Sequence, residues 1–219
     1  FIIMLKWSAK ISSFIVHPLF FLVINLYLLI CLKPQLFGVS SWQEKKMLLL
    51  LVGVYSICIP AISLLMLKFL KVIDSFELNQ RHERIFPLII VLIFYLWLWM
   101  NLKQDPSIPR EWNWYMLSAV ITTSMCLIVN NWFKISLHVA GIASTLLYWF
   151  WIKFIFAYDG ISYFNLGSEM TKGISLDYFI MIFTVLGAWI ATARLIIGKH
   201  DIHEIIIGTP DYSCNSRQN

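Results

Sequence analysis

Six apolar segments follow one another along the chain, and each is flanked by polar or charged residues. None of them alternates apolar and polar positions, as the strands of a membrane barrel do. In lipid, backbone N–H and C=O groups must be paired within the segment itself, so each segment is predicted to be a helix. The predicted helices cover residues 13–32, 47–70, 86–102, 114–129, 135–157 and 178–197.

The connections between these segments are polar and too short for a soluble domain. We therefore predict an all-α polytopic membrane bundle of about six transmembrane helices, forming one domain over residues 1–219. The first apolar stretch is long enough to span a membrane, so we expect no separate cleavable signal peptide. Trp112, Trp114 and Tyr115 cluster at one helix boundary, as the side chains of an interfacial aromatic belt do.

Composition supports this prediction. Apolar residues make up 59% of the 219 residues and charged residues 13%, against roughly 45–50% and about 25% in soluble domains. Too few charged residues remain to cover a soluble globule, and disorder or coiled coil is excluded. The net charge of +5 is interpreted as basic loops beside anionic membrane lipids, and we expect no nucleic-acid partner.

The four cysteines do not form a recognisable framework. None stands at C-x-x-C spacing, and three of them lie inside apolar runs. Such positions favour buried free thiols over disulfides or a zinc site. The cysteines are Cys31, Cys58, Cys126 and Cys214.

The histidines are unevenly distributed between the two predicted membrane faces. Consecutive helices reverse direction, so every second connection lies at the same face. Of the five histidines, His82, His138, His200 and His203 lie near one face, and His17 lies toward it inside the first apolar run. The connections at the other face contain no histidine. This distribution indicates a site at one face of the bundle.

The start of the fifth predicted helix has the composition of an anion site. Lys134 and His138 are four residues apart and share one helical face. Ser136 adds a hydroxyl, and the helix N-terminus adds unpaired N–H groups. The alternative is a lysine that extends to the interface beside a histidine with a purely structural role.

The segment after the sixth helix carries a second candidate group. If His200 begins a helix, Glu204 stacks on it one turn later and can orient the imidazole. Arg194 offers a two-pronged donor for phosphate or carboxylate. The alternative is a metal site formed by His200, Asp201, His203 and Glu204, which the neighbouring cations disfavour.

Arg81 and Arg84, three residues apart, add positive charge at the same face. Taken alone, they are equally typical of contacts with lipid headgroups. Taken together with the two groups above, they complete a set of cations, two histidines and a carboxylate. This combination suits attack on a phosphate ester by one histidine, with proton transfer from the other.

At these positions the sequence resembles the type 2 phosphatidic acid phosphatase superfamily, which includes lipid phosphatases, glucose-6-phosphatase and vanadium haloperoxidases. The family's third motif is S-R-x5-H-x3-D. It is present here as Ala193-Arg194-x5-His200-x3-Glu204. Arg, His and the acid keep the family spacing, with Ala in place of Ser and Glu in place of Asp.

The other two motifs match less closely. The second, P-S-G-H, is present as Ser136-Leu137-His138, with Leu in place of Gly. In the first, K-x6-R-P, Pro87 matches while Asn79 and Phe86 occupy the Lys and Arg positions. The stretch from Lys134 to Gly141 and the early His-Pro-Leu at 17–19 resemble a bacterial subgroup found in Bacteroidetes.

The resemblance implies a role for each matched residue. His200 would be the nucleophile that forms a phosphohistidine, Glu204 would orient it, and His138 would be the general acid. No metal or other cofactor would be needed. The implied phosphate-binding residues are Arg194, Lys134 and Ser136, together with Arg81 and Arg84.

The resemblance also implies the substrate class and the location. The substrate would be a membrane lipid carrying a phosphate monoester or pyrophosphate. The site would face the periplasm of a bacterial inner membrane. Family members have a further helix after the third motif, whereas residues 209–219 are polar here, so we expect a truncated or degenerate member. Two alternatives remain: an inactive relative that binds lipid headgroups or scaffolds a partner, and a transporter or channel.

Overall fold

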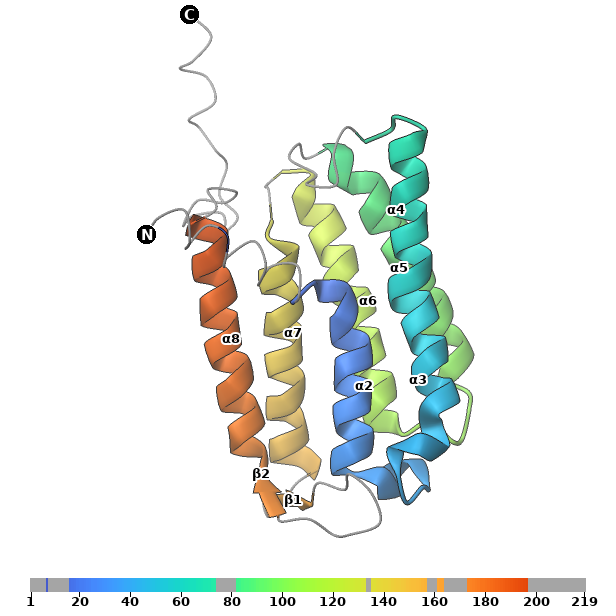
Figure 1. Cartoon of the computed structure of the whole chain (residues 1–219), viewed down its shortest axis with the longest axis vertical. Helices are drawn as coiled ribbons and strands as arrows, with labels where there is room; N and C mark the ends of the chain where they lie inside the picture. Colours follow the sequence, from blue (N-terminus) through green and yellow to red (C-terminus); the bar gives the residue numbers. More distant parts are fainter. Residues whose placement is uncertain are drawn as a thin grey trace, which may run out of the picture.

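Antiparallel helices build the fold, and the computed structural model describes them over most of the chain (Figure 1). The predicted all-α membrane bundle is confirmed. The structure describes residues 7, 16–73, 82–132, 135–156, 161–163 and 173–196. The helices of these residues are α2 (Phe21–Leu32), α3 (Lys46–Gly53), α4 (Ile59–Phe69), α5 (Ile85–Leu102), α6 (Arg110–Asn130), α7 (Leu137–Trp151) and α8 (Leu176–Ile196).

Five helical stretches of the described chain are long and apolar enough to cross a membrane. Four of them correspond to α5, α6, α7 and α8, and the fifth contains α3 and α4 in one continuous run. The first apolar segment is shorter and covers Pro18–Leu32. The protein is therefore a membrane protein in which one helical element is shorter than the rest.

The short element begins later than predicted. Val16 and His17 lie outside any helix, and a 3-10 turn, η1 (Pro18–Phe20), precedes α2. The predicted start at residue 13 is therefore wrong at these two positions. The reason is Pro18, whose ring disfavours helical backbone angles in the preceding residue while being well suited to a first helical position. His17 is accordingly extended, with φ −74° and ψ 138°.

The length of this element has a geometric consequence. At 1.5 Å per residue, the stretch Pro18–Leu32 spans about 22 Å, less than the roughly 30 Å of a hydrocarbon core. In Figure 1 the start of α2 lies below the upper ends of α4, α6 and α8. The start of α2 is therefore recessed relative to the ends of α4, α6 and α8.

A proline also shapes the second apolar segment. Between α3 and α4 the helix widens into a π-helical turn, η4 (Val54–Cys58). Pro60 has no N–H to donate to the carbonyl group of Ser56, and its ring would clash with that carbonyl in a regular helix. The wider turn accommodates this conflict without ending the helix.

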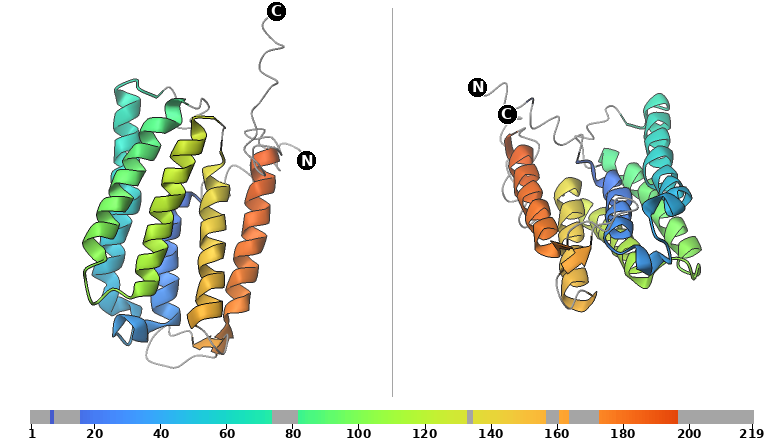
Figure 2. Two further views of the ribbon diagram at one scale, coloured as in Figure 1. Left: turned by 180° about the vertical axis from the view of Figure 1, so that it is seen from behind. Right: turned by 60° about the horizontal axis from the view of Figure 1, so that its bottom comes forward.

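Helix α2 lies inside the bundle, between α3, α6 and α7, with α8 at one side and α4 at the other (Figure 2). It is apolar around its whole circumference, which is typical of a buried helix. Eight of its twelve residues are buried, whereas α4 buries only Pro60. The main core cluster joins residues of α2 to residues of α5, α6, α7 and α8.

The two ends of the bundle differ in chemistry. We call the end that carries His17, His82 and His138 the histidine end. The opposite end, the hairpin end, carries strands β1 (Ile161–Tyr163) and β2 (Gly173–Ser175), which pair antiparallel. There Lys153 and Asp177 form an ion pair. The predicted alternation of faces is thus confirmed for the three described histidines.

Two local predictions are wrong. Trp112 and Tyr115 are buried inside the bundle, and of the predicted belt only Trp114 is exposed, at 57%. All three residues lie within α6, which begins at Arg110, and Trp112 and Tyr115, three residues apart, share the face of α6 that is turned into the bundle. Cys31 and Cys126 are buried free thiols as predicted, but Cys58 is exposed; Cys214 lies outside the described residues.

Candidate functional site

Four of the eight predicted site residues are described, and all four lie at the histidine end. They are Arg84, Ser136, His138 and Arg194. They come from the starts of α5 and α7 and from the end of α8. The other four predicted residues, Arg81, Lys134, His200 and Glu204, lie outside the described residues.

His138, in the first turn of α7, lies against the ring of His17. The ring centroids are 5.2 Å apart and the planes cross at 83°, an edge-to-face contact. His17 comes directly before η1, so the pair joins the starts of two helices. The sequence placed His17 inside an apolar run and assigned it no role. The one signal that could have identified it is Pro18, which fixes where the helix starts.

The protonation of His17 is defined by its surroundings. Its Nδ1 accepts a hydrogen bond from the backbone N–H of Leu19, at 3.4 Å. A neutral imidazole that accepts at Nδ1 carries its proton on Nε2. Burial, together with the positive charge of Arg194, lowers the pKa of His17 to about 4. His17 is therefore neutral near pH 7, with its N–H on Nε2.

Arg84 is buried, with 5% of its surface exposed. Its Nη1 donates a hydrogen bond to the carbonyl oxygen of Ile135, at 2.9 Å. This bond ties the start of α5 to the segment that leads into α7. The interpretation of Arg84 as an ordinary surface contact with lipid headgroups is thus wrong, because its guanidinium lies inside the bundle.

Ser136 is the N-cap residue of α7 and is 2% exposed. Its hydroxyl group has no hydrogen-bond partner among the described residues. Burying an unpaired hydroxyl group is unfavourable. Ser56 and Tyr148 also have buried hydroxyl groups that lack a partner within the described chain. What distinguishes Ser136 is its position at a helix N-terminus, two residues before His138, where an anion is stabilised.

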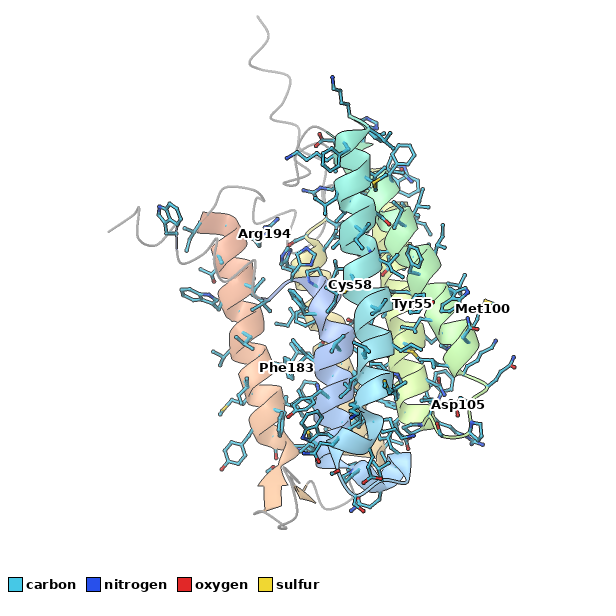
Figure 3. All side chains as sticks on the ribbon, turned by 45° about the vertical axis from the view of Figure 1, so that its right-hand side comes forward. Tyr55, Cys58, Met100, Asp105, Phe183 and Arg194 are labelled. Atoms are coloured by element: carbon cyan, nitrogen blue, oxygen red, sulfur yellow. The ribbon has the colours of Figure 1, made fainter. Side chains whose placement is uncertain are left out.

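Arg194 lies in the last turn of α8. Figure 3 shows it near the end of this helix. Its charge acts on His17, so a cation from the last described helix lies within electrostatic range of the first. The structure thus brings the end of α8 to the same place as the starts of α2 and α7.

A cavity of about 130 Å³ extends from His17 and Arg84 into the bundle. At the histidine end its lining includes His17, Arg84 and Leu137. Deeper, it is lined mainly by apolar side chains of α2, α5 and α6 and reaches Tyr95 and Tyr115. Arg84 and Tyr95 are eleven residues apart on one helix, which corresponds to a depth of about 16 Å. The cavity therefore has a basic end and a long apolar body.

Gly141 allows the close packing that forms the cavity wall. A Cβ atom at this position would lie 3.0 Å from the Phe21 ring and 3.1 Å from Cβ of Pro18. The start of α2 can thus approach α7 closely only because residue 141 has no side chain. This contact brings His17 to His138, one turn away on each helix.

A second polar cluster lies in the middle of the bundle and was not predicted from the sequence. Asn25 donates to the hydroxyl of Tyr115 at 2.7 Å and to that of Thr145 at 3.3 Å. Its Oδ1 accepts from Nε1 of Trp149 at 2.7 Å. Tyr115 and Thr145 are themselves 3.0 Å apart. The signal available in the sequence was an asparagine inside an apolar helix, where polar residues join helices.

The alternative metal site is not tested by the structure. His200, Asp201, His203 and Glu204 lie outside the described residues. Among the residues that are described, no three His, Cys, Asp or Glu side chains are grouped to hold a metal ion. The candidate site is thus a group of histidines, arginines and a serine.

Neither a family model, nor a curated protein, nor a solved structure matches this chain.

Proposed function

We propose that the protein is a metal-independent phosphatase that hydrolyses a phosphate monoester or pyrophosphate on a membrane lipid. The observation that carries the proposal is the cavity in a membrane bundle, with its apolar body and with His17 and Arg84 in its lining at the histidine end. A lipid phosphate has the same division into an anionic end and an apolar chain. The phosphate would bind at the histidine end.

The described residues support three parts of this chemistry. His138 is in position to exchange a proton with a ligand at the start of α7. Arg84 and Arg194 supply the positive charge that phosphate oxygens require. Ser136, with its buried hydroxyl group, lies at the helix N-terminus, where N–H groups add further donors.

The covalent step is taken from the family resemblance. A nitrogen of His200, oriented by Glu204, attacks phosphorus as the bond from phosphorus to the leaving oxygen breaks. His138 gives its proton to that oxygen. A water molecule, deprotonated by His138, then attacks the phosphohistidine and releases inorganic phosphate. Lys134 and Arg81 would complete the phosphate-binding set.

The substrate class follows from the apolar body of the cavity. Candidates are phosphatidate, phosphatidylglycerol phosphate, an isoprenyl pyrophosphate and a lipid A phosphate. All have a phosphate group on a hydrocarbon anchor. From the family resemblance we also propose a location: a bacterial inner membrane, with the histidine end facing the periplasm.

The test is phosphate release in detergent with EDTA present, over a panel of these four lipids. Wild type is compared with His200→Ala and His138→Gln. The matched control is His82→Gln, because His82 is an exposed histidine at the same end. We expect release by wild type and the control, and loss in the two site variants. Full activity of His200→Ala would contradict the proposed mechanism.

A second outcome would distinguish the phosphatase from the main alternative, an inactive relative that binds lipid phosphates. If no lipid is hydrolysed but one binds to wild type and not to Arg84→Gln, the protein is a binding protein for lipid phosphates. Substrate-dependent flux into liposomes would instead indicate a transporter.

A further inference from the structure

We propose that His17 is a further phosphate-binding residue of this site, with its Nε2–H donating a hydrogen bond to a phosphate oxygen of the ligand. This inference rests on the proposed function, because it assumes that a phosphate group binds at the histidine end. Neither the sequence pattern nor the family motifs assign a role to this residue.

The first argument is position. His17 lines the cavity at the same end as Arg84, and its ring contacts that of His138. It is held there by the extended backbone before Pro18 and by the close approach of α2 to α7 at Gly141. A phosphate group bound at this end of the cavity would therefore lie next to His17, which lines the cavity there.

The second argument is the unused donor. The Leu19 N–H occupies Nδ1 of His17, so the proton of the neutral ring is on Nε2. No hydrogen bond links this Nε2 to another residue of the described chain. A partly buried N–H group gains most from an ionised acceptor, since such hydrogen bonds are roughly twice as strong as neutral ones.

The third argument is charge. Arg84 and Arg194 already supply positive charge around the histidine end. A neutral donor adds a hydrogen bond without adding repulsion between cations. His17 therefore complements the arginines in a way that a third arginine or a lysine would not.

A structural role for His17 must be separated from a ligand-binding role. As the N-cap of η1, His17 also satisfies the Leu19 N–H. His17→Asn keeps an acceptor close to the Nδ1 position, and asparagine is a favourable N-cap residue. It cannot place a donor where Nε2 lies. His17→Gln does the reverse: its amide N–H group reaches the Nε2 position and can donate there, but its side chain no longer accepts from the Leu19 N–H.

The experiment measures binding of dodecylphosphonate, a single-chain phosphonate with a C–P bond that is not hydrolysed. Titrations in detergent use wild type, His17→Asn, His17→Gln and the control His82→Asn. We expect His17→Asn to raise Kd by roughly tenfold to a hundredfold, the loss of one hydrogen bond to a charged group. Its melting temperature should stay close to that of wild type. His17→Gln should bind more tightly than His17→Asn.

The outcomes separate the two proposals. Wild-type Kd in His17→Asn, or no phosphonate binding by wild type, would overturn the role of His17. Weakened binding by His17→Asn in a protein that hydrolyses no lipid would support the role of His17 and contradict the phosphatase proposal. A weaker Kd in His17→Asn that is matched by an equal loss in His82→Asn would overturn the inference as well, because the effect would not be specific to the site.

Discussion

Two polar clusters lie in the described part of the bundle, and they differ in how many of their polar atoms are hydrogen-bonded. In the central cluster, Asn25, Tyr115, Thr145 and Trp149 bond to one another across three helices. At the histidine end, the hydroxyl group of Ser136 is buried without a partner in the described chain. The first cluster is complete as a hydrogen-bonded network. In the second, the hydroxyl group of Ser136 can still donate a hydrogen bond, for example to a bound anion.

This difference separates structural from functional polar residues in the membrane. A polar side chain in lipid is costly unless it is paired, whichever purpose it serves. Where the bundle itself supplies the partners, the residue joins helices. Where the partners are missing beside fixed cations, an external group can supply them. Substitutions in the two clusters should therefore affect different measurements.

The largest expected effect is on turnover. His138→Gln removes the proposed proton donor, and we expect kcat to fall by roughly 10²–10⁴-fold. The melting temperature in detergent should change little. Phosphate release from the best lipid of the panel measures the effect, with His82→Gln as the control. A variant with wild-type kcat would remove His138 from the mechanism.

The next effect is on stability and concerns the central cluster. Asn25→Leu leaves the buried Nε1 of Trp149 without its partner. It also removes the bonds to Tyr115 and Thr145, which still bond to each other, so we expect the free energy of unfolding to fall by about 2–4 kcal/mol. Unfolding by heat or by a denaturing detergent measures it. Asn25 also donates a hydrogen bond to the carbonyl oxygen of Phe21 in its own helix, at 2.8 Å. Asn101→Leu is the control, since the exposed Asn101 donates the same kind of bond to the carbonyl oxygen of Trp97. Equal losses in the two variants would show that the central network contributes nothing beyond this bond.

Ser136→Ala should weaken ligand binding without lowering the stability of the protein. Removing an unpaired buried hydroxyl group should leave stability unchanged or raise it by up to about 1 kcal/mol. Removing a donor to the charged phosphonate should weaken dodecylphosphonate binding by roughly tenfold or more. Thr145→Val, in the central cluster, is the comparison and should lose stability. A Ser136→Ala variant that is clearly less stable than wild type would mean that the hydroxyl group is paired in the folded protein.

The smallest expected effect comes from Gly141→Ala. Gly141 lies on α7 between His138 of the histidine end and Thr145 of the central cluster. The added methyl group would overlap the Phe21 ring and Pro18 at a cost of about 1–3 kcal/mol. Alanine is about 1 kcal/mol more favourable than glycine inside a helix, so the free energy of unfolding should fall by about 1 kcal/mol in total. Gly187→Ala is the matched control, because its nearest neighbour atom would lie at 3.6 Å. That variant should be as stable as wild type or more stable.

Much of the fold could be predicted because apolar length and polar flanks determine where membrane helices form. The predicted segment 178–197 corresponds to α8, and 86–102 to α5, within two residues at each end. The shared face of the described histidines followed from counting reversals of direction, which needs no knowledge of side-chain contacts. The resemblance to a phosphatase family stays a prediction.

What could not be predicted depends on which face of a helix points inward. Helix α2 is apolar around its circumference, so its pattern gives no direction for Asn25. Trp112 and Tyr115 were expected at the interface because aromatic rings are common there, yet both are buried. Arg84 was predicted to bind phosphate, with a headgroup contact as the alternative, but its hydrogen bond to the carbonyl group of Ile135, 51 residues away in sequence, was not predicted. Such contacts depend on how helices pack, and hydropathy does not contain that information.

Pro18 has an effect that begins before the protein folds. Its ring restricts the backbone of His17 to extended conformations in the unfolded chain as well. Fewer conformations are then lost when the site assembles, so less entropy opposes the ordering of His17. The observed backbone angles of His17 belong to that restricted set. The backbone that carries the imidazole is thus partly preorganised by its covalent neighbour, before any contact with α7 forms.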